Sequence, residues 1–289
     1  MDHVRMRGHA PTVRLRRLAA ELRRVRAAAR LTQDAACRAT NINETTLYRI
    51  ETARVRPQTR TLLALLDLYQ VDDEQRGYLI TLCKEAAVQG WLRPYHSELP
   101  EEYTAYISFE DEAHGVRNYE SLFIPGLLQT EEYAQTVIRG VLPWATPAEV
   151  NDRLQARMER KAVLTKDNPL NLWAILDEAA LRRMVGGPAV MKRQLATLAA
   201  AREATNINLQ VIPFGVGAHP GMPGSFVLMD FADPMDADLI YIDSMAGDLF
   251  LESEADLRRY TSIFDTLRAI ALSPDESATL ITNLIRDIK

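Results

Sequence analysis

The sequence predicts an all-α N-terminal domain of five helices followed by an α+β C-terminal domain. Before residue 88, apolar residues recur at spacings of three and four, which is typical of amphipathic helices. After residue 100, helical stretches alternate with short apolar runs that are typical of strands. Between the two, residues 89–100 contain Gly90, Pro94 and Pro100, which favour a linker. The predicted domains are therefore residues 1–88 and 101–289, joined by residues 89–100.

Charge is distributed unevenly along the chain. Residues 1–60 contain 14 Arg, no Lys and 5 Asp or Glu, which gives this region a net charge of +9. Because the whole chain carries −5, the remainder carries −14. A basic N-terminal region beside an acidic remainder is typical of a nucleic-acid-binding protein with a separate second module. The acidic remainder also limits non-specific binding along DNA.

Composition argues against several other protein classes. Cys37 and Cys83 each lie on a predicted helix among apolar neighbours, so we expect buried thiols rather than a disulfide framework or a metal site. No apolar run of export length follows the basic residues 1–12, so no signal peptide is expected. No apolar run approaches the ~20 residues of a membrane span. We therefore expect a cytoplasmic protein that does not cross a membrane.

The first predicted helix runs from Val13 to Ala29, where Leu15, Leu18 and Leu22 fall on one face. Residues 1–11 precede it as a basic arm. Two interpretations of this arm stay open: it is disordered, or it contacts phosphates or a minor groove of DNA.

Two short helices are predicted between Leu31 and Arg56, where the sequence reads LTQDAACRATNINETTLYRIETARVR. Thr32 is a good N-cap for a helix over 33–39, and Asn41 tolerates the left-handed backbone that would end it. Asn43 is placed to cap a second helix that runs to about residue 52. Leu47 and Ile50 would face inward on this helix, with Ile42 between the helices and polar side chains pointing outward. Two packed amphipathic helices without a DNA-binding role are the alternative interpretation.

Two further helices complete the predicted N-terminal domain. The fourth spans residues 59–68, with Leu62, Leu65 and Leu66 facing inward. The fifth spans residues 74–88 and is capped by Asp72 or Asp73. Its predicted inward residues are Tyr78, Leu79 and Leu82.

The C-terminal half mixes strands and helices, which predicts a layered α+β domain. The predicted strands are 118–124, 171–176, 208–212, 225–230 and 239–242. The predicted helices are 131–140, 147–164, 178–185, 190–205, 253–272 and 274–288. Ser273 followed by Pro274 is a typical helix start, because serine caps the helix and proline fits its first position. The acidic run of Glu110, Asp111 and Glu112 is predicted to lie on a helix surface.

The spacing of the second and third helices matches the helix-turn-helix, in which the second helix enters the major groove. Its residues resemble the Cro and phage-repressor type of regulator, usually called XRE-type. The resemblance implies a small buried residue at Cys37, base contacts from the start of the second helix, and phosphate contacts on either side of it. The implied DNA-binding residues are Gln33, Asn43, Glu44, Thr45, Thr46, Tyr48, Arg49, Arg54 and Arg56. That family often has glycine where this chain has Asn41 and Ala53.

The C-terminal half resembles the corresponding domain of many actinobacterial XRE-type regulators. The motifs that carry this resemblance are FIPGLLQT within 119–130, EEYA at 131–134, LDEAALRRMVGGPAVMKRQL at 176–195, and NLQVIPF at 208–214 with His219 after it. The resemblance implies a DNA-binding regulator that is antitoxin-like and works with a small partner protein encoded nearby. It leaves open what this domain binds.

No catalytic residues, metal site or cofactor are predicted. His114 and His219 have no ligand or catalytic partner at useful spacing, which favours structural or surface roles. The segment 215–224, GVGAHPGMPG, lacks the order of a phosphate-binding loop. It is either a plain hairpin connection or the rim of a pocket or protein interface.

Together these observations predict an all-α helix-turn-helix domain followed by an α+β regulatory domain. We expect a homodimer that binds double-stranded DNA sequence-specifically and regulates transcription, with a C-terminal domain that dimerises, senses a ligand, or does both. The alternative is an antitoxin-like protein that binds a small partner protein and autoregulates its operon. An enzyme with an attached helix-turn-helix is a third hypothesis, although the chain shows no convergent catalytic set.

Overall fold

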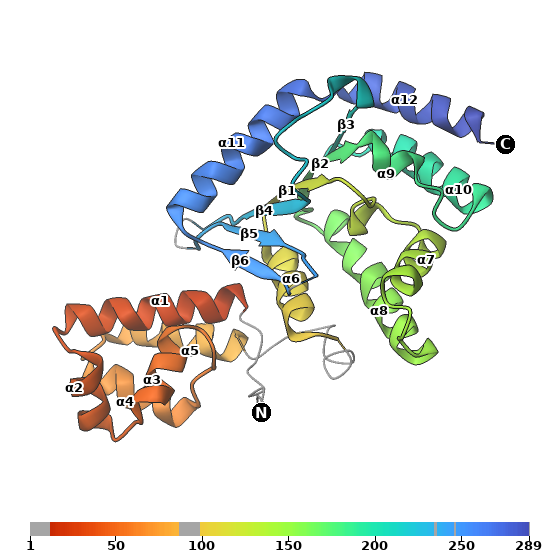
Figure 1. Ribbon diagram of the computed structural model, residues 1–289. Coiled ribbons are helices and arrows are strands. Elements are labelled where there is room, and N and C mark those ends of the chain that lie inside the picture. The colour runs from red at the N-terminus through yellow and green to blue at the C-terminus, as the bar shows by residue number, and fades with distance from the viewer. Residues whose placement is uncertain (1–11, 87–98, 234–235, 246, 289) are drawn as a thin grey trace. The chain divides into compact units, whose positions relative to one another are not determined.

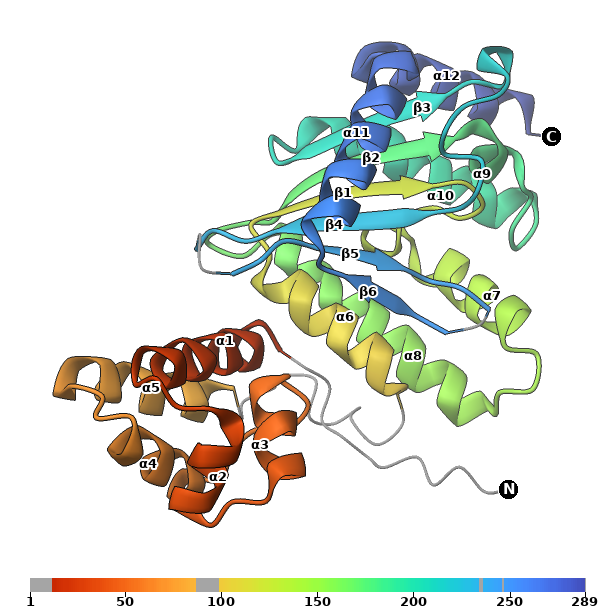
Figure 2. The same ribbon diagram turned by 60° about the vertical axis from the view of Figure 1, so that its left-hand side comes forward.

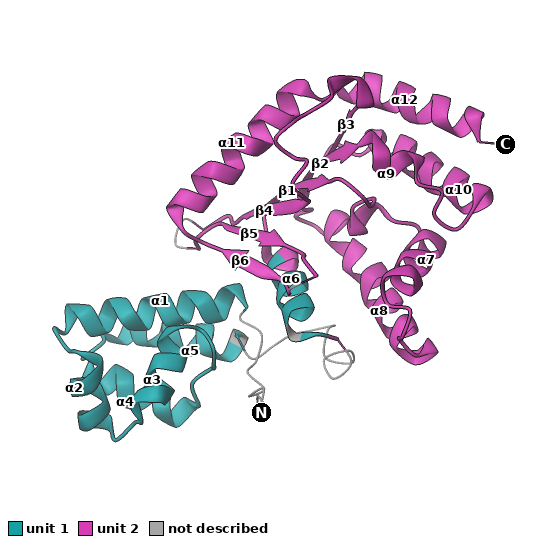
Figure 3. Ribbon diagram, in the orientation of Figure 1, with its two compact units in different colours: residues 1–96, 100–109 teal, residues 97–99, 110–289 magenta. Residues whose placement is uncertain are grey.

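The computed structural model describes residues 12–86, 99–233, 236–245 and 247–288. The chain divides into two compact units, residues 1–96 with 100–109 and residues 97–99 with 110–289 (Figure 3). The first unit begins with five helices, and the second combines a six-stranded sheet with helices, which confirms the predicted fold class. The predicted basic arm, and residues 89–98 of the predicted linker, lie outside the described residues. The predicted domain boundaries stay predictions.

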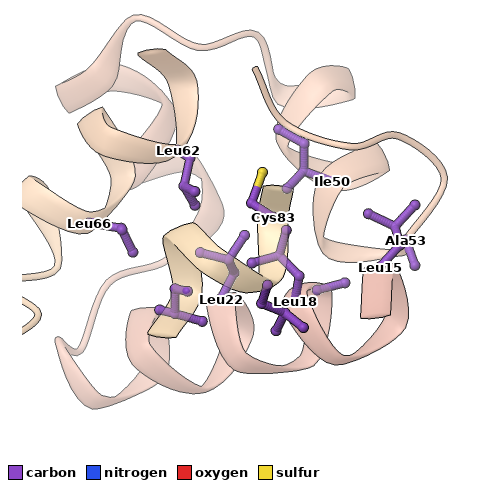
Figure 4. Close-up of a cluster of buried hydrophobic side chains, with 11 residues drawn as sticks. Leu15, Leu18, Leu22, Ile50, Ala53, Leu62, Leu66 and Cys83 are labelled. Atoms are coloured by element: carbon purple, nitrogen blue, oxygen red, sulfur yellow. The ribbon is translucent and has the colours of Figure 1, made fainter. Parts of the chain in front are cut away.

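The five predicted helices of the N-terminal region are all present. They are α1 (Val13–Ala28), α2 (Gln33–Thr40), α3 (Glu44–Glu51), α4 (Thr59–Leu68) and α5 (Asp73–Glu85). A core shared by α1, α3, α4 and α5 contains Leu18 and Leu22 from α1, Ile50 from α3, and Leu62 from α4 (Figure 4). Cys83 of α5 completes this cluster as a buried thiol, as predicted.

Four of these helices end at a residue in the left-handed conformation, and none of the four is glycine. Arg30, Asn41, Ala53 and Gln70 have φ between 53° and 56°. After α4, the Gln70 amide donates to the Asp67 carbonyl and the next amide donates to the Leu66 carbonyl. This pair of bonds closes the helix in the Schellman pattern. Asn41 therefore has the predicted role, and Ala53 takes the backbone that glycine usually provides.

Two expectations for α5 are corrected. Tyr78 was expected to face inward, but its side chain is 43% exposed. The buried stripe of α5 consists of Leu79, Leu82 and Cys83, and Tyr78 points roughly 100° away from Leu79 around the helix. The helix also ends at Glu85 rather than near residue 88, whereas its cap, Asp72, is one of the two predicted.

The second unit contains one mixed sheet with the strand order β3-β2-β1-β4-β5-β6. Its strands are β1 (Gly115–Glu120), β2 (Asn171–Asp177), β3 (Ile207–Ile212), β4 (Phe226–Asp230), β5 (Leu239–Ile242) and β6 (Leu249–Leu251). β1, β2 and β3 are parallel, and the other neighbouring pairs are antiparallel. The carboxyl ends of β1, β2 and β3 therefore lie at one edge of the sheet (Figure 2).

Helices cover the two faces of this sheet unequally (Figures 1 and 2). They are α7 (Glu131–Val141), α8 (Pro147–Glu159), α9 (Glu178–Arg182), α10 (Pro188–Ala200), α11 (Glu254–Ile270) and α12 (Pro274–Asp287), whereas α6 (Glu101–Glu112) spans the boundary between the two units. Among the described residues, α11 is the only α-helix whose side chains join the apolar cluster on one face. The described helices include none long and apolar enough to cross a membrane.

Three elements after residue 100 differ from expectation. β1 starts at Gly115 and ends at Glu120, because the chain leaves the ladder before Pro125 and turns into a short 3-10 helix. The strand β6 and the helix α6 were not predicted. α6 is buried around most of its circumference, since residues 104–110 are all buried, so it lacks the polar face that reveals a surface helix.

The acidic run in α6 is not wholly on a helix surface as expected. Glu110 is 1% exposed, and its Oε1 lies 2.7 Å from Nε of Arg160, which is 5% exposed. Arg160 follows α8 and is 50 residues away in the chain, so spacing within α6 could not reveal this partner. A buried carboxylate of this kind is stable only when it is paired.

Candidate nucleic-acid interface

A three-residue turn joins α2 to α3 and sets their relative orientation. Thr32 caps α2 by accepting a hydrogen bond from the Ala35 amide at 3.1 Å. Asn41 turns the chain in the left-handed conformation, and Asn43 then caps α3 by accepting from the Thr45 amide at 2.8 Å. These are the cap and turn residues that the sequence predicted. Two helices joined this tightly have the geometry of a helix-turn-helix.

The inner side of α3 is fixed by apolar contacts. Leu47 is fully buried in a cluster with Ala36 and Cys37 of α2, and the half-buried Ile42 packs against it. Ile50 belongs to the other cluster, with α1 and α4. Cys37 is 6% exposed, as a small residue at the crossing of two helices should be. The two aliphatic side chains of α3, Leu47 and Ile50, are therefore turned away from solvent.

The outer side of α3 is polar and accessible. Asn43, Glu44, Thr45 and Thr46 are exposed, and Tyr48 is 49% exposed. The guanidinium of Arg54 lies 5.9 Å from the centre of the Tyr48 ring, so the loop after α3 borders the same surface. We define the α3 face as Asn43, Glu44, Thr45, Thr46 and Tyr48 together with the half-buried Arg49. The structure thus places these six predicted residues on one helix and its cap.

Glu51 was not singled out by the sequence, yet it holds the motif together. Its side chain is 1% exposed and accepts from Nε and Nη2 of Arg26 at 2.7 and 2.9 Å. The same carboxylate accepts a hydrogen bond from Nε2 of the Gln33 side chain at 2.7 Å. One buried carboxylate therefore links α1, the start of α2 and the end of α3. The hydrogen bonds that Arg26 donates to Glu51 also raise the pKa of Arg26 above its ordinary value.

The predicted phosphate-binding residues occupy different environments. Gln33 is half-buried and donates one amide hydrogen to Glu51, which leaves the other free because an amide nitrogen carries two. Arg54 and Arg56 are exposed, and Arg56 makes a long contact of 3.5 Å to the Cys83 carbonyl. Within the described residues, the Arg49 side chain has no hydrogen-bond or ion-pair partner in the protein. Its charge is thus available to a bound molecule.

A second polar site lies at the carboxyl edge of the parallel strands in the sheet unit. His219 places Nε2 3.2 Å from Oδ2 of Asp177, which ends β2, and Nδ1 accepts from the Gly221 amide at 3.3 Å. The neutral ring must therefore carry its hydrogen on Nε2 and donate it to the carboxylate. Gly221 lies against the buried Tyr119 ring, where a Cβ would approach a ring carbon to 2.6 Å. This arrangement fastens the glycine-rich segment to the sheet.

Exposed apolar side chains lie in the connections that follow the parallel strands and α9. Leu122 follows β1, Met184 follows α9, Phe214 follows β3, and Met222 lies within the glycine-rich segment. Their side chains are between 48% and 65% exposed. We call these four residues the carboxyl-edge patch. Exposed apolar residues that gather in one region are typical of interaction surfaces.

The sheet unit offers little for catalysis or metal chemistry in the ranges that the structure describes. No group of three His, Cys, Asp or Glu side chains there could hold a metal ion. In the part of the chain that the structure describes, no Ser or Cys side chain hydrogen-bonds to the His219–Asp177 pair. Burial raises the pKa of Tyr119 above its ordinary value, which keeps its hydroxyl neutral.

Comparison with known protein families assigns both halves of the chain. Residues 17–79 match a helix-turn-helix domain, which covers α1 to most of α5 and contains the α3 face. This match supports a DNA-binding regulator of the helix-turn-helix class. No curated protein and no solved structure shows a significant match. Residues 103–283 match the family described as Domain of unknown function (DUF5753), which covers more than half of the chain. The chain therefore belongs to the DUF5753 family and carries an N-terminal helix-turn-helix domain.

Proposed function

We propose that the protein is a sequence-specific transcriptional regulator of the XRE type that reads DNA with the α3 face. The observation that carries this proposal is the exposed polar surface of α3, which the apolar clusters and Glu51 hold outward. With its side chains an α-helix is about 10–12 Å in diameter, which is comparable with the width of the major groove. The helix therefore fits the groove without rearrangement of its own unit.

The chemistry of each side chain suggests a role on the DNA. Glu44 would accept a hydrogen bond from a cytosine amino group, and Arg49 would donate to guanine or to a phosphate. Asn43 and Thr45 would contact adenine or thymine. Thr46 and Tyr48 extend this surface. Phosphate contacts would come from the remaining predicted residues, which are Gln33, Arg54 and Arg56.

Substitutions on the α3 face test this proposal directly. We expect Glu44→Ala and Arg49→Ala each to lower discrimination between operator and altered sequence by about 1–3 kcal/mol, because each removes a base contact. Neither residue belongs to the apolar core, so circular dichroism should report an unchanged fold. Binding is measured by fluorescence anisotropy, with the operator first found by genome-wide mapping of bound sites. If both variants bind that operator as the unsubstituted protein does, the reading surface is elsewhere.

We also infer that the protein binds DNA as a homodimer. One short recognition helix contacts few base pairs, so a single copy has limited specificity. Two copies would read a near-palindrome whose half-sites lie about 34–36 Å apart. The DUF5753 unit would supply the contact between copies, sense a ligand, or do both. Analytical ultracentrifugation of the full-length protein tests the dimer, and a monomer at every concentration would contradict it.

The carboxyl-edge patch favours a second candidate, in which the protein is antitoxin-like and holds a small partner protein encoded nearby. Flexible methionines together with an exposed aromatic ring are typical of protein-binding surfaces. We expect Phe214→Ser with Met222→Ser to abolish co-purification of the neighbouring small protein after co-expression. Leu280→Ser, on the half-buried side of α12, would serve as a matched loss of apolar area elsewhere. Retained co-purification by the double variant would exclude this patch.

A further inference from the structure

The sheet face that carries α11 is only partly covered. The apolar cluster on this face includes Phe264 and Leu267 of α11, which are fully buried. On either side of the helix, Trp173, Ile242 and Leu251 remain half-buried. Among the described residues no second α-helix joins this cluster, and apart from α11 only Val216 of the short 3-10 helix Phe214–Val216 adds to it from a helical element, so the apolar face continues beyond the width of α11. A surface of this kind can accept a further protein layer.

The outer side of α11 carries a shallow groove of about 730 Å³. It is lined entirely by this helix, through Leu257, Arg258, Thr261, Ser262, Asp265, Thr266, Ala269 and Ile270. A groove lined by one helix cannot surround a small molecule, and small-molecule sites usually bury most of the ligand surface. Its shape suits another helix, since the short side chains at its centre allow two helix axes to approach within about 8–10 Å.

The charges along this groove are arranged symmetrically. Arg258 and Asp265 are seven residues apart, so they lie on the same side of the helix. Each is about 5 Å along the axis from the midpoint between Thr261 and Ser262, at 1.5 Å per residue. If a second α11 ran antiparallel through this midpoint, Arg258 of each copy would face Asp265 of the other. A two-fold interface requires this property, because residue i must contact j while j contacts i.

We propose that the outer side of α11 is the self-association surface of the DUF5753 unit, and that its occupant is α11 of a second copy. The inference rests on the proposed homodimer and names the surface that forms it. The α11 pair would form the centre of the interface, and the half-buried apolar residues beside α11 would extend it. Such an extension is needed because a stable interface buries about 800 Å² on each partner.

Ion pairs within α11 do not oppose this arrangement. Arg258 pairs with Glu254 at 3.0 Å, and Asp265 pairs with Arg268 at 3.3 Å. The side chains of Arg258 and Asp265 are 72% and 52% exposed, so water weakens both pairs. Exchange of these contacts for pairs between copies therefore loses little. The Glu254 and Arg268 charges would remain at the rim of the interface, where they stay solvated.

Charge reversal in the full-length protein tests the proposal. In a two-fold pair, Arg258→Glu places four carboxylates opposite one another, and Asp265→Arg places four guanidinium groups together. We expect each variant alone to weaken dimerisation at least tenfold in sedimentation experiments. An equimolar mixture should restore a heterodimer, because both contacts then join opposite charges. The double variant R258E/D265R should form homodimers for the same reason.

A matched variant on another helix separates this effect from loss of charge alone. Arg286→Glu reverses an exposed arginine on α12 and should leave the dimer unchanged. If both single α11 variants dimerise like the unsubstituted protein, the proposed surface is wrong while the homodimer stands. Failure of the mixture to pair, when each single variant is folded by circular dichroism, also overturns it. An unsubstituted protein that is monomeric at all concentrations instead removes the homodimer itself.

Discussion

At the scale of single residues, the helix ends of the first unit adopt a backbone that their side chains do not favour. Arg30, Ala53 and Gln70 each occupy the left-handed region, where a Cβ costs roughly 1–2 kcal/mol. The hydrogen bonds that close these helices hold the residues there. This conformational cost is smallest at Asn41, because its short polar side chain tolerates the left-handed region. The three other positions are thus places where the native state is less stable than it could be.

The exposed Gln70 offers the simplest test of this cost. We expect Gln70→Gly to raise the free energy of unfolding by about 0.5–1 kcal/mol, because the gain in the native state exceeds the added flexibility of the unfolded chain. Gln70→Ala should change it little, since alanine keeps the Cβ. Urea unfolding followed by circular dichroism gives both values. A glycine variant less stable than the alanine variant would contradict the assignment.

Glu120 makes the stability of the second unit depend on pH. Burial raises the pKa of Glu120 to about 7 from an ordinary value of 4.5, although hydrogen bonds from Ser225 and Asn118 partly oppose this rise. The folded state therefore keeps the proton where the unfolded chain releases it. Stability is then highest below pH 4.5 for this group and falls as pH rises toward 7. We expect Glu120→Gln to remove this fall.

The difference between Glu120→Gln and the unsubstituted protein should grow from pH 4.5 to 7 and approach about 3 kcal/mol at most, at 1.4 kcal/mol per pKa unit. Urea unfolding across this range, followed by tryptophan fluorescence, measures it. Glu149→Gln provides a control of opposite sign. The hydrogen bonds from Thr146 lower the pKa of Glu149, so its contribution disappears only as pH falls below 4.5. A constant difference for Glu120→Gln would contradict the raised pKa.

At the scale of elements, the position of α3 depends on one buried carboxylate. Glu51→Ala leaves Arg26 with its charge 16% exposed and without its partner, which typically costs about 3–5 kcal/mol. We expect faster amide exchange in α1, α2 and α3, measured by hydrogen–deuterium exchange with mass spectrometry. Thr46→Ala, on the exposed side of the same helix, should change stability by less than about 0.5 kcal/mol. Equal exchange in both variants would mean that Glu51 does not hold the motif.

Elements with local signals were predictable from the sequence. The caps Thr32, Asn43 and Ser273 lie at the expected helix starts, because capping depends on neighbouring residues only. The helix α6 and the strand β6 were missed for physical reasons. A helix buried on most sides has no polar face, and a three-residue edge strand is too short for an alternating pattern.

The same limit applies to the candidate site. The exposed side chains of α3 follow from helical periodicity, so the sequence could place them correctly. Glu51 and Glu110 could not be assigned, because their partners Arg26 and Arg160 are 25 and 50 residues away. The His219–Asp177 pair spans 42 residues and was missed for the same reason. Ion pairs between distant elements leave no periodic trace in one sequence.

At the scale of the whole molecule, the opposite charges of its two halves should appear in the salt dependence of DNA binding. The logarithm of the binding constant should fall linearly with the logarithm of salt concentration, because arginines release counterions from phosphates. We expect Arg54→Ala to weaken binding to all sequences equally and to reduce this slope by about one per bound subunit. Arg49→Ala should instead change which sequence is preferred. Anisotropy titrations with operator and scrambled duplexes distinguish the two.

The control for this prediction is Arg193→Ala, which removes an exposed cation from α10 in the DUF5753 unit. Its salt dependence should match that of the unsubstituted protein. An Arg54→Ala variant with an unchanged slope would place the phosphate contacts elsewhere.

Asp177 performs two tasks with one carboxylate. Its Oδ1 accepts from the Ala179 amide and so starts α9, while its Oδ2 holds His219 and, through it, Gly221. The segment that carries Phe214 and Met222 is therefore held by the Asp177 carboxylate, which also caps α9. A bound molecule that displaces this segment from Tyr119 must also disturb the first turn of α9. Binding at the carboxyl-edge patch would thus reach α9 through the Asp177 carboxylate, without any movement of the strands.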